Sequence, residues 1–299
     1  MRLTIVRAQH AAGKRLGFTL VELLVVITII FVLVALTASA TMRVLAVQEQ
    51  KNTETNIEKA YTLLDLHWKE VAGKAEREPS VVPASVLSMA GQNANRARVI
   101  WVKMNLKREF PETFSEARSN LIAELPPLPA YVSALQGITG VAAAEESAAC
   151  LYMALNRARG SIATNSETVF NPSELKATNK PEIKIPRDMW GNALVFCRWP
   201  TGDPQLNPSP APGPAGRDPQ EPLGLLASDQ SWVNSVGGTQ FKTMCHPVAY
   251  QKSYQLIPVI MSAGPDKTLG VDPSTLAPTS NASLDNIYSY RLRMGGKAN

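Results

Sequence analysis

The chain has 299 residues, of which 45% are hydrophobic and 18% charged, and its formal net charge is +5. The first 17 residues contain no acid and contribute +4 of this net charge, through Arg2, Arg7, Lys14 and Arg15. The rest of the chain is close to neutral and has no basic stripe interleaved with aromatic residues, so nucleic-acid binding by the folded part is not indicated.

An uncharged segment follows this basic leader. Leu23 to Met42 are 20 residues without a charge, the length that a helix needs to cross about 30 Å of hydrocarbon. Because the basic residues precede it, the positive-inside rule predicts a single-pass protein with a cytoplasmic N-terminus and everything after Arg43 outside. A removable secretory signal is the alternative, but the length of the apolar run and the presence of Glu22 argue against it.

Glu22 stands at the start of the apolar segment, where a carboxylate costs free energy and usually has a partner. The apolar run itself contains no Lys or Arg. If the chain were cut after Gly17, the new α-amino group of Phe18 would lie at the depth of Glu22. Within one helix this pair would be strained, whereas the amine of one helix can meet the carboxylate of a neighbour that is shifted along its axis.

The stretch "GFTLVELLVVI" resembles the N-terminal signature of type IV pilins and of the pseudopilins of type II secretion systems. In that family a prepilin peptidase cuts after the glycine and N-methylates the new first residue, and the glutamate sets the register between subunits. The resemblance implies cleavage of leader 1–17 after Gly17, methylation of Phe18 and a register role for Glu22. Many family members carry a proline where this chain has Ser39, so we expect a helix without a proline kink.

The resemblance also implies a location and partners. We expect a subunit held in the bacterial inner membrane, with its C-terminal domain in the periplasm, that is extracted into a filament on assembly. Its partners would be the prepilin peptidase, other pilin or pseudopilin subunits, the inner-membrane assembly platform and the lipid bilayer. A type II secretion pseudopilus and a type IV pilus-like filament both fit, and an adhesive or DNA-uptake pilin is the alternative.

Beyond Arg43 the apolar pattern becomes one-sided. We expect one helix with a transmembrane half at 18–42 and an amphipathic half at 43–78, ended by Gly73 and Pro79. The polar run 48–56 is expected to cross solvent, and His67 to lie on the exposed side. The apolar stripe has helical spacing and consists of Ile57, Tyr61, Leu64, Trp68 and Val71.

Residues 79–180 are expected to form a mostly helical insertion. "EESAACLYMALNRARG" has acids first and arginines last, which suits the helix dipole, and "SEARSNLIAEL" predicts another helix. "RARVIWVKMNLKREF" fits a helix or a strand. The basic residues of this region predict a solvated face rather than a contact with lipid headgroups or an acidic partner: Arg96, Arg98, Lys103, Lys107 and Arg108.

Residues 181–299 carry short β-branched or aromatic runs between Pro, Gly and Asn, which predicts an antiparallel sheet domain. The strands are expected in "EIKI", "ALVFCRW", "YQLIPVIMS" and "IYSYRLR", with a turn at Gly191–Asn192 and an edge strand or bulge at Pro258. Eight prolines in residues 200–222 predict an extended loop. The fold class is therefore α+β, a long N-terminal helical spine packed on a small antiparallel sheet, with a mostly helical insertion.

The C-terminal loops gather oxygen-bearing side chains between turns at Gly264 and Gly270. Such loops suit Ca²⁺, and this region resembles the end of major pseudopilins that holds a structural calcium. Turn and capping roles are the alternative, and no cofactor is required. The candidate calcium ligands are Asp266, Asp272, Asp285 and Asn286.

Cysteine and motif content favour a structural protein. Cys150, Cys197 and Cys245 form no CxxC pair and permit either a Cys197–Cys245 disulfide or buried free thiols. No P-loop, dinucleotide fingerprint, nucleophile elbow or metalloprotease motif occurs, so we do not expect a membrane-anchored periplasmic enzyme. The bulk of the insertion favours a minor or tip subunit over a major one.

Overall fold

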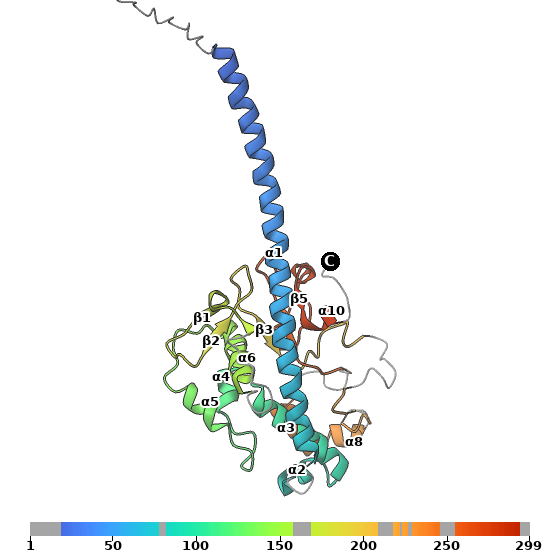
Figure 1. The fold of residues 1–299 in the computed structure, drawn as a ribbon. Helices are drawn as coiled ribbons and strands as arrows, with labels where there is room; N and C mark the ends of the chain where they lie inside the picture. Colours follow the sequence, from blue (N-terminus) through green and yellow to red (C-terminus); the bar gives the residue numbers. More distant parts are fainter. Residues whose placement is uncertain are drawn as a thin grey trace, which may run out of the picture. The chain divides into compact units, whose positions relative to one another are not determined.

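The computed structural model describes residues 19–77, 82–157, 169–208, 218–221, 223–226, 229–245 and 255–293. The chain divides into two compact units, Met1–Gln48 and Glu49–Asn299. Helices predominate over short antiparallel strands (Figure 1), so the α+β class is confirmed. Gly17 and Phe18 lie outside the described residues.

Helix α1 spans Leu20–Arg77, 58 residues, and includes both predicted halves of the spine. It runs past Gly73, where the sequence predicted its end, and the Nε of Arg77 donates a hydrogen bond of 3.0 Å to the carbonyl of Gly73. A glycine inside a helix costs about 1 kcal/mol relative to alanine. That cost is too small to end the helix here, because the residues after Gly73 also pack against the core: Ala75 is buried in it.

The predicted apolar stripe of α1 packs into the core of the second unit, where α1 has helices and strands on both sides (Figure 1); Val71 is partly buried and the other four residues are buried. Two expectations about its polar residues were wrong. Thr53 and Asn56 of the polar run are buried, and Thr53 Oγ1 accepts a hydrogen bond of 3.2 Å from the backbone of Met189. His67 is only 7% exposed, because its ring packs edge-on against Phe110 at a centroid distance of 4.9 Å.

The described part of the insertion is mostly helical, as predicted. The ambiguous "RARVIWVKMNLKREF" lies in helix α3, and the Asn93 side chain caps this helix by accepting from the backbone of Arg96. The predicted helix in "SEARSNLIAEL" ends early, at Arg118, and a bridge between Ile122 and Leu125 follows. The helices are α2 (Ala84–Met89), α3 (Ala94–Glu109), α4 (Phe114–Arg118), α5 (Pro129–Ala134) and α6 (Glu146–Arg157).

Two basic residues of α3 do not lie on the solvated face that we predicted, whereas Arg98 is exposed as expected. Arg96 is 6% exposed and binds Asp229 at 2.6 Å. Lys103 is fully buried and pairs with Asp218. Asp218 lies near the end of the proline-rich loop and Asp229 lies after it, so these two cations tie both places to α3.

The described strands form two small antiparallel sheets. Strands β1 (Leu175–Ala177) and β2 (Lys184–Pro186) pair with each other. In the other sheet, β4 (Val259–Ser262) lies between β3 (Val195–Cys197) and β5 (Ile287–Tyr288).

Three details of the sheets differ from the predictions. Strand β4 is central rather than at an edge. Pro258 does not prevent this, because it lies just before the first residue of the strand. The run "IYSYRLR" leaves the sheet after Tyr288 and continues as helix α10 (Ser289–Arg293). Strand β1 was not predicted, because its sequence LKA has no β-branched residue. The turn at Gly191 is confirmed, with φ of 86° and a bridge between Arg187 and Ala193 that closes it.

The remaining described elements complete the second unit. They are helices α8 (Gln230–Val233) and α9 (Val236–Cys245), and the 3-10 helices η2 (Ala143–Glu145), η3 (Pro172–Glu174) and η6 (Asn281–Leu284). The described residues of the proline-rich loop, 200–208 and 218–221, contain no helix or strand, and the others lie outside the description.

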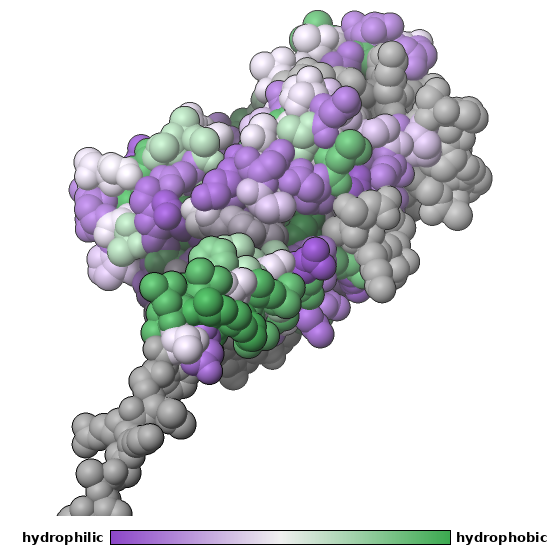
Figure 2. All heavy atoms as spheres, turned by 90° about the horizontal axis from the view of Figure 1, so that it is seen from above, coloured by the Kyte–Doolittle hydropathy of each residue, from purple (hydrophilic) through white to green (hydrophobic). Residues whose placement is uncertain are grey.

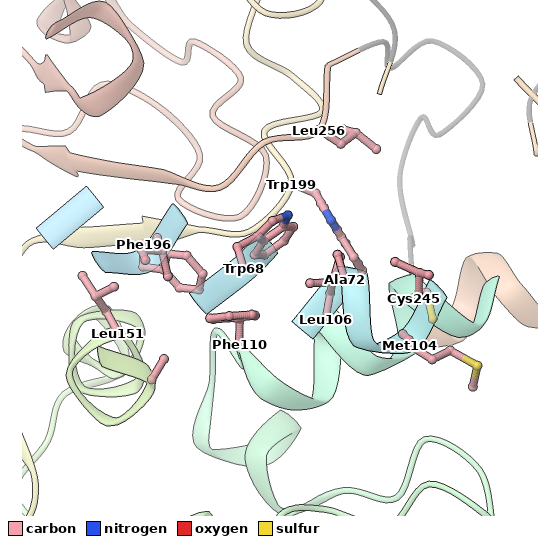
Figure 3. Close-up of a cluster of buried hydrophobic side chains, with 14 of the residues drawn as sticks. Trp68, Ala72, Met104, Leu106, Phe110, Leu151, Phe196, Trp199, Cys245 and Leu256 are labelled. Carbon is pink, nitrogen blue, oxygen red and sulfur yellow. The ribbon is translucent and has the colours of Figure 1, made fainter. Parts of the chain in front are cut away.

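Large side chains from α1, α3, α6 and β3 meet in the main core (Figure 3). The rings of Trp68 and Phe110 lie 5.0 Å apart, and Phe196 and Leu151 pack beside them. Burying such a side chain stabilises the fold by about 1.5–3 kcal/mol. This core fixes the outer half of α1 to the rest of the second unit.

The three cysteines are free and buried, so of the two alternatives the buried free thiols are confirmed and the Cys197–Cys245 disulfide is absent. Burial raises the pKa of Cys245 to about 11 and raises the pKa of Cys150 and Cys197 well above the ordinary value. Protonated buried thiols are poor nucleophiles. These cysteines therefore act as small apolar core residues.

Candidate functional site

Helix α1 begins with a reciprocal cap that joins Thr19 and Glu22. The backbone N–H and the hydroxyl of Thr19 both donate to Glu22 Oε2, at 2.8 and 2.9 Å. In return, the backbone N–H of Glu22 donates to Thr19 Oγ1 at 3.2 Å. This is a capping box, in which two orphan N–H groups of the first helical turn are satisfied.

The capping box explains how a single chain can tolerate an acid at this place. The carboxylate of Glu22 sits in the first helical turn, where the helix dipole favours negative charge. Its Oε2 accepts both hydrogen bonds from Thr19, and its Oε1 accepts none from the described residues. One oxygen of Glu22 is thus held by its own chain, and the other is open to a donor from elsewhere.

Sequence reasoning missed Thr19, although the signal was present. A Thr followed three residues later by Glu, just before an apolar run, is the sequence pattern of a capping box. Removing the Thr19 hydroxyl should cost about 1 kcal/mol of helix-start stability.

We predict that Thr19→Val raises the hydrogen-exchange rate of the Glu22 amide about fivefold, because the amide loses its acceptor. The exchange would be measured by NMR on the full chain in detergent micelles. Thr19→Ser keeps the hydroxyl and should exchange like the wild type. Equal rates in the valine and serine variants would contradict the role of the cap.

The first unit presents apolar side chains to its surroundings all around the helix. The large apolar residues from Leu20 to Val47 are exposed, from 47% for Val26 to 80% for Leu20. Figure 2 shows this end of the helix as a hydrophobic surface. Among the described residues, α1 is the helix that is long and apolar enough to cross a membrane. A helix that is hydrophobic on every side requires a lipid or protein environment.

Three threonine hydroxyls of this apolar helix donate hydrogen bonds to its own backbone. Thr28, Thr37 and Thr41 each donate to the carbonyl four residues earlier, at 2.8, 3.0 and 2.8 Å. In hydrocarbon, a polar group without a partner costs several kcal/mol. The threonines of α1 are therefore compatible with burial in a membrane.

Residues 13–38 match a family model described as the prokaryotic N-terminal methylation motif. The chain carries a prepilin-type methylation motif. This motif and the long apolar helix support its placement in the type IV pilin and pseudopilin family. They also support processing by a prepilin peptidase and a membrane-anchored, pilin-like protein. Neither the curated proteins nor the solved structures gave a match.

The prepilin motif contains every residue that the sequence assigned to processing and assembly. Gly17 and Phe18 lie within the match, immediately before the first described residue, Thr19. Glu22 lies within it too, on the capped first turn of α1. The cut after Gly17 would leave Thr19 as the second residue of the mature chain, so the cap would adjoin the new amine.

The structure brings together only two of the four predicted calcium ligands. The backbone N–H of Asp266 lies 3.4 Å from Asp285 Oδ2. Asp272 instead has its Oδ1 in a turn of its own, where it accepts from the backbones of Ser274 and Thr275 at 2.9 and 3.0 Å. This is the turn role that the sequence left as the alternative.

The side chain of Asn286 hydrogen-bonds to residues other than the three aspartates. It is 1% exposed, and its Nδ2 donates to the carbonyl of Leu269 at 2.6 Å. Among the described residues, no group of three or more His, Cys, Asp or Glu side chains is placed to hold a metal ion. The four residues do not converge as one donor set, and calcium binding stays a prediction.

Proposed function

We propose that the chain is a structural subunit of a filament, either a type II secretion pseudopilus or a type IV pilus-like fibre. The observation that carries the proposal is a capped carboxylate at the start of an exposed apolar helix, inside a prepilin motif. A helix with this surface gains by packing against identical helices, which replace the lipid around it.

The proposed assembly step uses the open oxygen of Glu22. Cleavage after Gly17 creates the α-amino group of Phe18, which the peptidase then methylates. In the filament, the amine of one subunit donates to Glu22 Oε1 of the next, while Thr19 holds Oε2. A charge-assisted hydrogen bond of this kind is strong where water is excluded. Because the donor and acceptor belong to different subunits, the bond fixes their axial offset.

We further propose a minor or tip position in the filament. The insertion adds the helices α2 to α6 to the second unit, and such bulk restricts helical packing around a filament axis. Orientation follows from the basic leader, with the N-terminus in the cytoplasm and the second unit in the periplasm. The adhesive or DNA-uptake pilin remains the alternative, and it differs in partner rather than in build.

We predict that Gly17→Leu keeps the leader and stays in the membrane fraction. The peptidase site of the family accepts glycine before the cut, and a leucine side chain would not fit there. The measurement is an immunoblot of membranes and sheared filaments from cells that contain the native assembly system.

Gly13→Leu is the matched control, because Gly13 belongs to the same leader but does not precede the cut. We expect this variant to be shortened and assembled like the wild type. Recovery of shortened Gly17→Leu protein in sheared filaments would overturn the proposed processing.

A further inference from the structure

A cavity of about 450 Å³ lies in the second unit, and the proposed filament role makes no use of it. It is formed by the outer part of α1, by α3, by the turn at residues 121–125 and by the end of α6. One side of it is apolar, and the other side carries charged groups. The apolar side consists of Val71, Ala75, Trp101 and Leu125.

The buried acid of this cavity, Glu109, already has its partners. Its Oε1 accepts from Arg157 Nε at 2.5 Å and lies 3.4 Å from His67 Nε2. Burial acts to raise the pKa of Glu109, but the hydrogen bonds with His67 and Arg157 outweigh burial and lower it. Glu109 is therefore ionised, and its charge is matched by Arg157.

Arg108 lines the same cavity and has no carboxylate of its own. Its Nη2 donates to Asn105 Oδ1 at 3.2 Å, and its buried Nε has no hydrogen-bond partner in the described part of the chain. No acid among the described residues forms an ion pair with it. Burial is the main cause that lowers the pKa of Arg108, and Glu109 offsets this only in part. A half-buried cation without a matching anion is costly.

The charges around the cavity indicate which anion would fit. Lys74, Arg108 and Arg157 are cationic, and Glu70, Glu109 and Glu124 are anionic. Glu70 and Glu124 are exposed at the rim, where they would repel a multiply charged phosphate. A single carboxylate has a lower charge and is repelled less, and it matches the planar guanidinium of Arg108, which can bind both oxygens.

We propose that this cavity binds an acidic side chain of a partner polypeptide, with Arg108 holding the carboxylate. Trp101 and Leu125 pack against the aliphatic part of that side chain, and a volume of about 450 Å³ is within the range of ligand sites in proteins. The site lies wholly in the second unit and does not depend on cleavage after Gly17.

The test compares two capped peptides on the full chain in detergent. The peptides are acetyl-Ala-Leu-Glu-Ala-amide and the same sequence with glutamine in place of glutamate, and binding is measured by isothermal titration calorimetry. We expect the glutamate peptide to bind at least tenfold more tightly than the glutamine peptide. This comparison uses the unmodified protein, so it holds even if a variant fails to fold. Equal affinities, or no binding of either peptide, would overturn the proposal.

Arg108→Gln should abolish the preference for glutamate. Arg98→Gln is the matched control, because Arg98 lies on the same helix, is exposed and does not line the cavity; it should bind like the wild type. Acetate and inorganic phosphate serve as competitors. Weak competition by both supports a peptide carboxylate, whereas phosphate that outcompetes the glutamate peptide, or acetate that binds as tightly as the peptide, would contradict it.

Discussion

Arg198→Met is expected to lower the free energy of unfolding by about 3 kcal/mol, because it leaves the partly buried Glu112 without its cation and leaves Glu116 with Lys107 alone. Arg198 is 2% exposed and follows strand β3. Its Nη1 donates to the Phe110 carbonyl at 2.6 Å and to Glu116 at 2.9 Å, and its Nη2 donates to Glu112 at 3.1 Å. The side chain thus ties the sheet to the connection between α3 and α4.

Urea unfolding of the full chain in detergent, followed by tryptophan fluorescence, measures this loss. Arg98→Met is the control, because Arg98 is exposed on α3 and exposed substitutions usually change stability by less than about 0.5 kcal/mol. A loss below 1 kcal/mol in Arg198→Met, or an equal loss in both variants, would contradict the importance of this network.

The same network predicts a dependence on pH. Burial alone would raise the pKa of Glu116, but Arg198 and Lys107 lower it far below its ordinary value of 4.5. A carboxylate with a lowered pKa stabilises the fold above its unfolded pKa, and this contribution is lost as the pH falls below that value. Glu112 shifts the other way, because burial raises its pKa. The test therefore compares the free energy of unfolding of the wild type and of Arg198→Met at several pH values. As the pH falls below 4.5, this free energy should decrease less in Arg198→Met than in the wild type.

Glu22→Ala is expected to insert and to be cleaved normally, but to enter filaments at least tenfold less than the wild type. The substitution removes the anion that the methylated amine of the neighbouring subunit needs. It also removes the capping box with Thr19, so the alanine variant alone does not separate charge from capping. The measurement is the ratio of protein in sheared filaments to protein in membranes, by quantitative immunoblot.

Glu22→Gln separates the two effects. A glutamine at this position still completes a capping box with threonine, but it carries no charge. If the intersubunit ion pair sets the register, the glutamine variant should assemble as poorly as the alanine variant. Assembly of Glu22→Gln at the wild-type level would refute the ion pair and leave Glu22 with a capping role only.

The spine and the strands were predictable because their signals are local. The apolar run after Glu22 and the stripe that includes Ile57 and Trp68 depend on spacing within one helix. Strands β2, β3 and β4 lie in β-branched or aromatic runs that are bounded by turn residues, and these runs predicted them. The prepilin motif is local as well, which is why Gly17, Phe18 and Glu22 could be assigned from the sequence.

The buried charges were not predictable, because their partners are far away in the sequence. Arg96 and Asp229 are 133 positions apart, and Lys103 and Asp218 are 115 apart. A charged residue on a helix is expected at the surface unless its partner is known, so these residues were assigned to a solvated face. His67 was misplaced for the same reason, since only the fold brings α3 against it. The proposed carboxylate site at Arg108 depends on these long-range contacts too.

The most direct test of the central claim is the intact mass of the mature protein purified from its native membrane. Cleavage and methylation predict a chain that begins at Phe18 and carries one added methyl group on its N-terminal amine. Fragmentation of the N-terminal peptide would place that methyl group. A mature chain that keeps residues 1–17, or that begins at any residue other than Phe18, would contradict the claim that this protein is a processed, pilin-like subunit.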